Sequence, residues 1–599
     1  MDDQRNLSVY YDGVLQTAAL HLIDKHQAVE VQYPGPDKEG ISKSFQIRCQ
    51  DQDAIFEIIL AIPYNFPDVF PTVFVPDPYF SRLYPIPHLD KRKVLCTFDA
   101  EVAHPNISNP HGILDEVIQK AFILLKKGKS GENSLDYLDE FESYWIQEAN
   151  SEILSLLSIS PETREIHLIS FTHPNWSVTK LVADTRMEGE TWLVQAGATV
   201  DPTRKKAFYL PLESIGLPPF PTKNGEFLKR LKTVSGDAVK PLLEFLNKDT
   251  RPSTIVFSMP YKDGHIIGAW EHANAQQYKT SHYKRKGKVQ KGLKGFRRWK
   301  RNALLELQRD FRDLGVKKQL VTRVDKMRLF TRGGDGEISS SQRIGIIGCG
   351  SIGSHITKSL VDFGIDQLLL IDKEKLTFGN VARHLCGAND VGNYKVRSVH
   401  QKLASHFPHL EVTTYEYDVL RLLRDYESVL NRCDFSIVAL GHFPTELRLN
   451  RLQKDGIINK PLLYVWVEPY LAGAHAVYVD PSYIGCLHCV FDEQHAFLKS
   501  VLAEPGLYSK REAGCQSTFV PYGIVEVKRF ILDLTFFIED IQYGKMKENV
   551  LFTWLGNLTL QKEKGRKIAG RWAVAENYSV RRFPLANFAR CEECNSNVI

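Results

Sequence analysis

Residues 343–364 read RIGIIGCGSIGSHITKSLVDFG, and the run QLLLID follows at residues 367–372. The first apolar run predicts a buried parallel strand, the glycine-rich turn leads into a helix, and QLLLID predicts a second strand. This strand–helix–strand order begins an open, doubly wound α/β sheet. We therefore predict a doubly wound domain over residues 336–599.

The turn between the first strand and the helix contains Gly348, Gly350 and Gly353. Glycines at these positions let the backbone approach phosphates, and the amides at the start of the helix stabilise the negative charge. Asp372 closes the second strand, 22 residues beyond Gly350. A carboxylate there can accept hydrogen bonds from ribose hydroxyls. These residues predict a nucleotide site, which a dinucleotide dehydrogenase would also have.

The next run, DKEKLTFGNVARHLCGANDVGNYKVRSV at residues 372–399, helps to decide whether the nucleotide site serves a dehydrogenase or another reaction. It resembles the adenylation signature of the ThiF and ubiquitin-activating family, with Asp372, Asn380, Arg383 and Lys395 at the matching positions. The resemblance implies a Rossmann-like fold that binds ATP. An Asn and two cations on the ATP phosphates would stabilise charge as pyrophosphate leaves, which hydride transfer does not need. Adenylation is therefore favoured over dehydrogenation.

Two further features of the nucleotide site follow from the same resemblance. Arg332, in LFTRGGDG, resembles the family's additional arginine near the nucleotide, often supplied across a dimer; the other reading is a surface charge. The family's metal-binding Asp follows the fourth strand, but SIVALGHFPTELRLN has Gly441 and His442 there. Mg²⁺ is expected with ATP, and His442 is a weak substitute ligand.

Four cysteines form two CxxC pairs, Cys486 with Cys489 and Cys591 with Cys594. Four thiolates make a closed tetrahedral Zn²⁺ site without an open position for catalysis. Enzymes of the ThiF type place their two pairs in this way. The sequence therefore predicts a structural zinc that fastens the C-terminal tail to its domain.

Cys515 is a separate, isolated thiol in SKREAGCQSTFVPYG. The cations Lys510 and Arg511 stand upstream and favour the nucleophilic thiolate. The position resembles the catalytic cysteine of activating enzymes, which captures the adenylated C-terminus as a thioester. Cys349 and Cys386 are interpreted as packing residues.

The N-terminal part, residues 1–158, is predicted to be a compact α+β domain. Proline-punctuated strand runs fill residues 45–78, and residues 112–158 carry helical spacing. The segments FEIILAIPYNFPDVFPTVFV and PHLDKRKVLCTF resemble ubiquitin-conjugating domains, with Cys96 as the acceptor cysteine. The family's His-Pro-Asn box precedes that cysteine. Here His88 stands before Cys96 and Asn106 after it, and the sequence does not say which stabilises the oxyanion.

Residues 159–335 are predicted to form a linking domain. IHLISF, TWLVQAG and STIVFSMP are strand-like, and Lys284 to Arg301 contains ten basic residues and no acidic one. This segment is read either as a solvated loop leading into a surface helix or as a patch for an acidic partner or nucleic acid.

Composition limits the class of protein. The 599 residues are too many for one core, and 43% apolar and 25% charged residues with a net charge of +5 are ordinary for a globular protein. Neither a signal peptide nor an apolar run of about 18 residues is found, so we expect a cytoplasmic protein without membrane contact. The ten cysteines favour metal and thiol chemistry over disulfides.

A conjugating-like domain in front of an adenylating domain resembles the ubiquitin-transferase-like proteins of bacterial CBASS antiphage operons. The resemblance implies a homodimer in which ATP activates the C-terminus of a cGAS-like nucleotidyltransferase or another ubiquitin-like protein. Cys515 then takes the acyl group, Cys96 receives it, and an unidentified amine is acylated. The transfer requires mobility between the two ends of the chain.

Two alternatives remain. One is a sulfur-carrier-protein adenylyltransferase of cofactor biosynthesis with an N-terminal docking module. The other is a non-catalytic assembly protein that binds nucleic acid through Lys284–Arg301, although nucleic acid is not the favoured partner.

Overall fold

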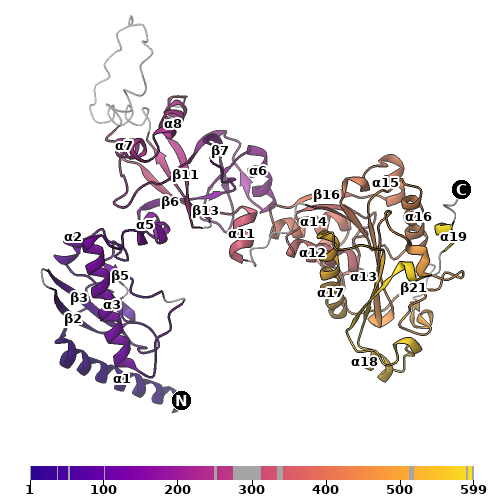
Figure 1. Cartoon of the computed structure of the whole chain (residues 1–599), viewed down its shortest axis with the longest axis horizontal. Coiled ribbons are helices and arrows are strands. Elements are labelled where there is room, and N and C mark those ends of the chain that lie inside the picture. Colours follow the sequence, from indigo (N-terminus) through magenta and orange to yellow (C-terminus); the bar gives the residue numbers. More distant parts are fainter. Residues whose placement is uncertain are drawn as a thin grey trace, which may run out of the picture. The chain divides into compact units, whose positions relative to one another are not determined.

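The computed structural model describes residues 2–36, 38–51, 54–99, 102–248, 252–262, 264–273, 312–333, 342–511, 518–588 and 591–595. The chain divides into two compact units, whose helices and strands are labelled in Figure 1. The first comprises Met1–Gly189 and Asp201–Arg323, and the second comprises Glu190–Val200 and Val324–Ile599.

The N-terminal part of the first unit contains an antiparallel sheet (Figure 1), and its five strands are ordered as in the chain. The strands are β1 (Val29–Glu30), β2 (Ile41–Asp51), β3 (Ala54–Pro63), β4 (Thr72–Phe74) and β5 (Val94–Leu95). Helices α1 (Asp2–His26), α2 (Tyr79–Leu83) and α3 (Pro110–Ser130) accompany them. This confirms an α+β arrangement at the N-terminus.

Helix α3 lies against β3 and also contacts α1. It begins after Asn109, whose side chain accepts the Gly112 amide at 3.0 Å, and it ends at Gly131, which takes the left-handed conformation with φ 77°. Ile113, Val117 and Ala121 are buried in the core between helix and sheet, as their spacing predicted.

The helical pattern predicted up to residue 158 is wrong in its last part. Two short helices, α4 (Asp136–Asp139) and α5 (Phe141–Glu148), are followed at once by strand β6 (Ala149–Ser155). β6 pairs with strands of the next sheet, so sheet hydrogen bonds override the local helical spacing. Phe141 and Trp145 of α5 are buried in the core of that next region.

The second sheet of the first unit closes on itself. Its strand order is β10-β11-β12-β13-β6-β8-β7, and β7 pairs back with β10. The strands are β7 (Arg164–Thr172), β8 (Lys180–Ala183), β10 (Lys205–Pro211), β11 (Ser253–Tyr261), β12 (Gly264–His272) and β13 (Lys317–Arg323). Helices α7 (Asn224–Val234) and α8 (Gly236–Lys248) contribute to its core.

The strands predicted at IHLISF and STIVFSMP are confirmed as β7 and β11. The strand predicted at TWLVQAG is wrong, because α6 (Arg186–Gln195) covers most of it. Trp192 and Leu193 are both buried although they are neighbours in the chain. A short apolar run can be a buried helix segment as well as a buried strand, so its pattern does not separate the two.

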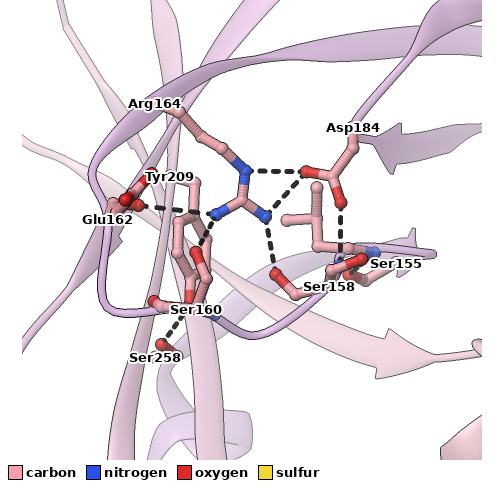
Figure 2. A network of polar contacts seen from close by, with 9 residues as sticks. Ser155, Ser158, Ser160, Glu162, Arg164, Asp184, Tyr209 and Ser258 are labelled. Carbon is pink, nitrogen blue, oxygen red and sulfur yellow. Dashed lines mark hydrogen bonds and ion pairs between the residues drawn. The ribbon is translucent and has the colours of Figure 1, made fainter.

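A polar network around Arg164 holds the start of β7 to its neighbours (Figure 2). The guanidinium donates to Asp184 at 2.8 Å, to the Ser160 hydroxyl at 2.7 Å and to the Ser158 carbonyl at 2.6 Å. It also lies over the Tyr209 ring, 4.2 Å from the centroid. The network therefore joins β7, β8 and β10 where the sheet closes.

The second unit contains a mixed sheet of order β16-β15-β14-β17-β18-β19-β22-β23. The parallel strands are β14 (Arg343–Ile347), β15 (Gln367–Ile371), β16 (Glu411–Tyr415), β17 (Phe435–Val438) and β18 (Leu462–Val467). Antiparallel strands β19 (Gly473–Val479), β22 (Val550–Leu555) and β23 (Val580–Pro584) extend one edge. The predicted doubly wound sheet is confirmed for its parallel part.

Helices of the second unit cover this sheet, and α12 packs beside α17 (Figure 1). The helices are α11 (Lys326–Gly333), α12 (Ser351–Asp362), α13 (Phe378–Val381), α14 (Lys395–His406), α15 (Val419–Asp425), α16 (Phe443–Lys454), α17 (Ile524–Gln542), α18 (Leu558–Glu563) and α19 (Glu592–Asn595). Within the described ranges, no helix combines the length and the apolar character needed to cross a membrane.

Candidate active sites

The phosphate loop predicted at Gly348–Gly353 follows β14 and leads into α12. Gly348 has φ 94°, and a Cβ there would lie 2.6 Å from the Ala439 carbonyl oxygen. A Cβ on Gly353 would lie 1.9 Å from the Gly348 carbonyl oxygen. Gly350 precedes α12 and has open space where a Cβ would be. Two of the three glycines are therefore required for packing, and the third leaves room beside the helix N-terminus.

Gly348, Gly350, Asp372 and Lys395 line one cavity of about 280 Å³ at the carboxyl ends of the parallel strands. This is where an open α/β sheet binds its ligand. Asp418 and His442, from the ends of two other strands, line the same cavity. The structure thus brings together four of the predicted nucleotide residues.

Asp372 is buried, and its two carboxylate oxygens already accept backbone amides. Oδ2 accepts from Cys349 and Oδ1 accepts from Glu374, both at 2.8 Å. Burial raises the pKa of the Asp372 carboxyl, and the amide hydrogen bonds oppose that rise. Asp372 therefore joins the phosphate loop to the end of β15.

Lys395 is the first residue of α14 and is buried. Its ammonium pairs with Glu374, and its amide donates to the Glu374 carbonyl at 3.0 Å. A buried cation beside the phosphate loop can stabilise phosphate charge more strongly than a solvated one.

Asn380 and Arg383 do not line this cavity, although both are described. Asn380 accepts hydrogen bonds from the amide and hydroxyl of Thr377, both at 3.0 Å. The Arg383 guanidinium lies over the Tyr522 ring, 5.0 Å from its centroid. The Arg383 carbonyl accepts the Ser351 hydroxyl at 2.9 Å, so this segment still touches the phosphate loop.

His384 is a supporting residue that the sequence analysis missed. Its Nε2 lies 2.8 Å from the Cys349 carbonyl oxygen, which can only accept, so Nε2 carries the proton. Its Nδ1 accepts the Cys386 amide at 2.9 Å. Burial lowers the pKa of His384, which keeps the ring neutral. Only the adjacency to Arg383 in the signature could have indicated it.

The place of the expected metal-binding Asp is taken by Gly441, with φ 62°, and by His442. His442 Nδ1 lies 2.8 Å from the Thr445 hydroxyl. Three carboxylates, those of Asp372, Glu374 and Asp418, line the cavity instead. Oxygen ligands of this kind suit Mg²⁺.

The four cysteines of the two CxxC pairs meet in space. Their sulfurs lie 4.0 Å (Cys486–Cys489), 3.5 Å (Cys486–Cys591), 3.7 Å (Cys489–Cys591) and 3.6 Å (Cys489–Cys594) apart. A tetrahedron with Zn–S bonds of about 2.3 Å has edges of about 3.8 Å. The spacing of the thiols therefore fits a Zn²⁺ ion.

Asn450 supports both halves of this cysteine cluster. Its side-chain oxygen accepts the Leu487 amide at 2.9 Å, and its Nδ2 donates to Glu593. Leu487 lies between the first two cysteines and Glu593 between the last two. Such outer hydrogen bonds orient metal ligands.

Cys96 follows β5 directly and is exposed. Its amide donates to the His88 carbonyl at 2.8 Å, and Leu89 pairs with Leu95 in an isolated bridge. Partial burial of the sulfur, followed by the carboxylates of Glu140 and Asp99, raises the pKa of the Cys96 thiol. The loop from His88 to Cys96 is therefore closed by backbone bonds and presents the thiol to solvent.

His88 is held on both ring nitrogens. Nδ1 lies 2.7 Å from Glu140 Oε1 and Nε2 lies 3.0 Å from Asp136 Oδ2. The hydrogen bond to Glu140 raises the pKa of His88. Since both nitrogens face carboxylates, His88 has no N–H to offer an oxyanion. Asn106, the other candidate, is exposed, and its side-chain oxygen accepts the Ser108 amide at 3.2 Å.

Some predicted residues fall outside the described ranges. Cys515 and the segment Lys284–Arg301 lie there, and the side chain of Arg332 is not described either. The two ends of the Cys515 segment are described: β20 (Lys510–Arg511) pairs with β21 (Thr518–Phe519), with Arg511 opposite Thr518.

Two segments of the chain match known protein families. Residues 324–515 match the ThiF family, and residues 37–154 match the prokaryotic E2 family B. The ATP-dependent ubiquitin transferase-like protein Cap2 of Escherichia coli (strain TW11681) is 22% identical over 481 residues, 75% of this chain and 78% of that protein. Cap2 of Vibrio cholerae serotype O1 is 23% identical over 521 residues, 81% of this chain and 86% of that protein.

A similar solved structure is that of E. coli MccB, at 19% identity and a TM-score of 0.28, covering 42% of this chain and 65% of that chain. The matched families and the Cap2 relatives support a function of the ubiquitin-like activation and conjugation type. The chain is therefore a fusion of a prokaryotic E2 family B segment with a ThiF-family segment, homologous to the Cap2 proteins.

Proposed function

We propose that this chain activates the C-terminal carboxylate of a protein with ATP, carries the acyl group on two thiols and joins it to an amine. The proposal depends on one observation above all. A phosphate-loop cavity with the buried Lys395 occurs in the same chain as the exposed Cys96, which directly follows strand β5 of the N-terminal sheet.

The proposed reaction has four steps. A carboxylate oxygen attacks the α-phosphorus of ATP, and pyrophosphate leaves. The Cys515 thiolate attacks the acyl carbon, and AMP leaves. The Cys96 thiolate then displaces Cys515, and the amine displaces Cys96 while losing a proton. Lys395 stabilises phosphate charge in the first step, and Asn380, Arg383 and Arg332 remain predicted contributors.

The metals have different roles in this scheme. Zn²⁺ on Cys486, Cys489, Cys591 and Cys594 would be structural, because four thiolates leave no open position. Mg²⁺ would accompany ATP, with the cavity carboxylates of Asp372 and Asp418 as candidate ligands in place of the residue missing at Gly441.

The partners are proposed from the resemblance. The activated protein would be a cGAS-like nucleotidyltransferase of an antiphage operon, and the adenylating domains would form a homodimer. The acceptor amine is not assigned. The name of the Cap2 relatives, ATP-dependent ubiquitin transferase-like protein, agrees with a transfer to an amine.

Trapped intermediates test the relay. Cys515→Ala should abolish every thioester and keep ATP–pyrophosphate exchange, whereas Cys96→Ala should let a reductant-sensitive Cys515 adduct accumulate. Gel analysis with and without reductant distinguishes these species. Normal conjugation by Cys96→Ala would disprove the relay, and a thiocarboxylate product would indicate sulfur-carrier chemistry instead.

A further inference from the structure

Two histidines of α1 and one aspartate of α3 form a cluster that neither the nucleotide cavity nor the thiol sites use. Within the described ranges, His21, His26 and Asp115 each offer one metal-ligand atom, and these atoms all lie within 4.8 Å of one another. The cluster lies in the first unit, whereas the four cysteines lie in the second. We call these three residues the α1–α3 site.

Both imidazoles of the α1–α3 site direct the same nitrogen at the same oxygen. Nε2 of His21 lies 2.9 Å from Asp115 Oδ1, and Nε2 of His26 lies 2.6 Å from it. In a tetrahedral zinc site with bonds of about 2.0–2.1 Å, the ligand atoms lie about 3.3 Å apart. The two nitrogen–oxygen distances therefore need to grow by only about 0.4 and 0.7 Å to admit an ion between the three atoms. Small rotations of the side chains provide this.

The two helices hold the ligands in place. Leu22 and Leu114, the chain neighbours of His21 and Asp115, are fully buried in the N-terminal core. Helix α1 packs against α3, and the His111 ring stacks on the His21 ring, with 4.4 Å between centroids and 3° between planes. Ligands on helices are placed more precisely than ligands on loops. The convergence of the three side chains therefore belongs to the fold.

The site is open to solvent on one side. The side chains of His21, His26 and Asp115 are 16%, 19% and 30% exposed. Lys25 donates to Asp115 Oδ2 at 2.7 Å, which leaves Oδ1 to the histidines. The Lys25 side chain is 57% exposed, and a surface ion pair of this kind contributes little, so Lys25 can turn to water when another cation arrives.

We propose that the α1–α3 site binds Zn²⁺ through Nε2 of His21, Nε2 of His26 and Oδ1 of Asp115. Imidazole and carboxylate are ligands that zinc takes, and three protein ligands leave the fourth position to water. Each neutral ring then carries its proton on Nδ1, so that the Nε2 lone pair is free for the metal. The ion fastens the last turn of α1 to the start of α3. The site needs neither ATP nor a reactive thiol, so it is independent of the proposed relay.

Zinc content of the full chain tests the site. Four thiolates hold zinc more tightly than three ligands and a water, so the purified chain should carry the cysteine-bound ion alone. Equilibrium dialysis against added zinc should then load one more ion per wild-type chain. His26→Ala should weaken this second binding by more than the about 10–100-fold that loss of an outer hydrogen-bond partner costs. His104→Ala, at an exposed histidine of the same unit, is the matched control and should load as the wild type does.

A hydrogen-bonded cluster without metal is the other reading, and two variants separate it from a zinc site. Asp115→Asn keeps an oxygen that accepts from both rings but loses the charge, so it should lose the second zinc while remaining folded. Lys25→Met removes a cation beside the ion, so it should tighten zinc binding by a few fold. Equal zinc loading by the wild type, His26→Ala and Asp115→Asn, or no tightening in Lys25→Met, would overturn the inference.

Cobalt locates the second ion. Co²⁺ added to the chain whose cysteines already hold zinc should give the visible absorption of a tetrahedral site with nitrogen and oxygen ligands. It should not give the near-ultraviolet bands of a cobalt–thiolate bond. Thiolate bands, or a cobalt spectrum that His26→Ala leaves unchanged, would place the ion elsewhere and refute the site. ATP–pyrophosphate exchange should be the same with and without the second ion, so adenylation is judged separately.

Discussion

At the scale of single residues, the phosphate loop depends on the absence of two side chains. Gly353→Ala would place a Cβ 1.9 Å from the Gly348 carbonyl oxygen, so the loop must move. We expect this substitution to destabilise the second unit by about 1–3 kcal/mol, as overpacking does, and to abolish ATP–pyrophosphate exchange. Gly387→Ala is the control, because nothing lies within 4 Å of its Cβ position. Equal exchange rates in the two variants would contradict this role.

A second prediction at this scale concerns the carboxylates that hold His88. The hydrogen bond to Glu140 raises the pKa of His88, so its stabilising effect is complete below the ordinary His pKa and is lost as pH rises through the raised value. The hydrogen bond from His88 helps to lower the pKa of Glu140 against the effect of burial, so that contribution exists above the ordinary Glu pKa and is lost as pH falls through the lowered value. Glu140→Gln should therefore lower stability most between about pH 4.3 and 6.5, where both groups are charged.

The Cys96 amide reports on this contact, because it donates to the His88 carbonyl. Hydrogen–deuterium exchange of the peptide that contains it should show about 1–3 kcal/mol less protection in Glu140→Gln within that pH window, and a smaller difference at higher pH. Glu142→Gln, at an exposed position of α5, should leave protection unchanged. A loss of protection that does not vary with pH would argue against the ion pair.

The sequence predicts a single residue best when the chemistry that requires it lies within a short stretch of the chain. Gly348 and Gly353 could be found because strand–turn–helix chemistry dictates them within a short stretch, and Lys395 because residues 372–399 resemble the adenylation signature. His384 and the contact between His88 and Glu140 could not. Each depends on a partner tens of residues away that only the folded chain brings near.

At the scale of elements, the cluster of four cysteines is predicted to bind zinc and so to fasten the last helix. The short α19 supplies Cys594, directly follows Cys591, and is held further by Glu593 to Asn450. Cys591→Ser should remove the metal and release the C-terminal tail to proteases, while the sheet core remains folded. Metal analysis should give about one zinc per wild-type chain and much less in the variant. Cys49→Ser, in a strand of the other unit, should keep the full zinc content.

Elements were predictable where periodicity and capping agree, and they were missed where tertiary pairing decides. α3 has the Asn109 cap, the final Gly131 and a buried helical stripe, so its sequence predicts it. β6 follows a helical pattern without a break, and only pairing with β13 and β8 makes it a strand. TWLVQAG is a short apolar run, for which sequence periodicity does not separate strand from helix.

At the scale of the whole molecule, fusing the two thiols in one chain should raise their effective concentration for each other. The wild-type rate of product formation should therefore be independent of enzyme concentration when expressed per chain. A mixture of Cys96→Ala and Cys515→Ala chains separates donor from acceptor. In that mixture the rate per chain should rise with concentration and stay well below that of the wild type when dilute.

Subunit pairing could bring donor and acceptor together in such a mixture, so both samples should be measured down to concentrations at which subunits dissociate. If transfer normally occurs within one chain, the wild-type rate per chain should persist on dilution while the mixture becomes second order. If transfer occurs between paired subunits, the wild-type rate per chain should fall on dilution together with that of the mixture. Product formation by the two mixed chains at the wild-type rate under dilute conditions would show that the fusion gives no advantage.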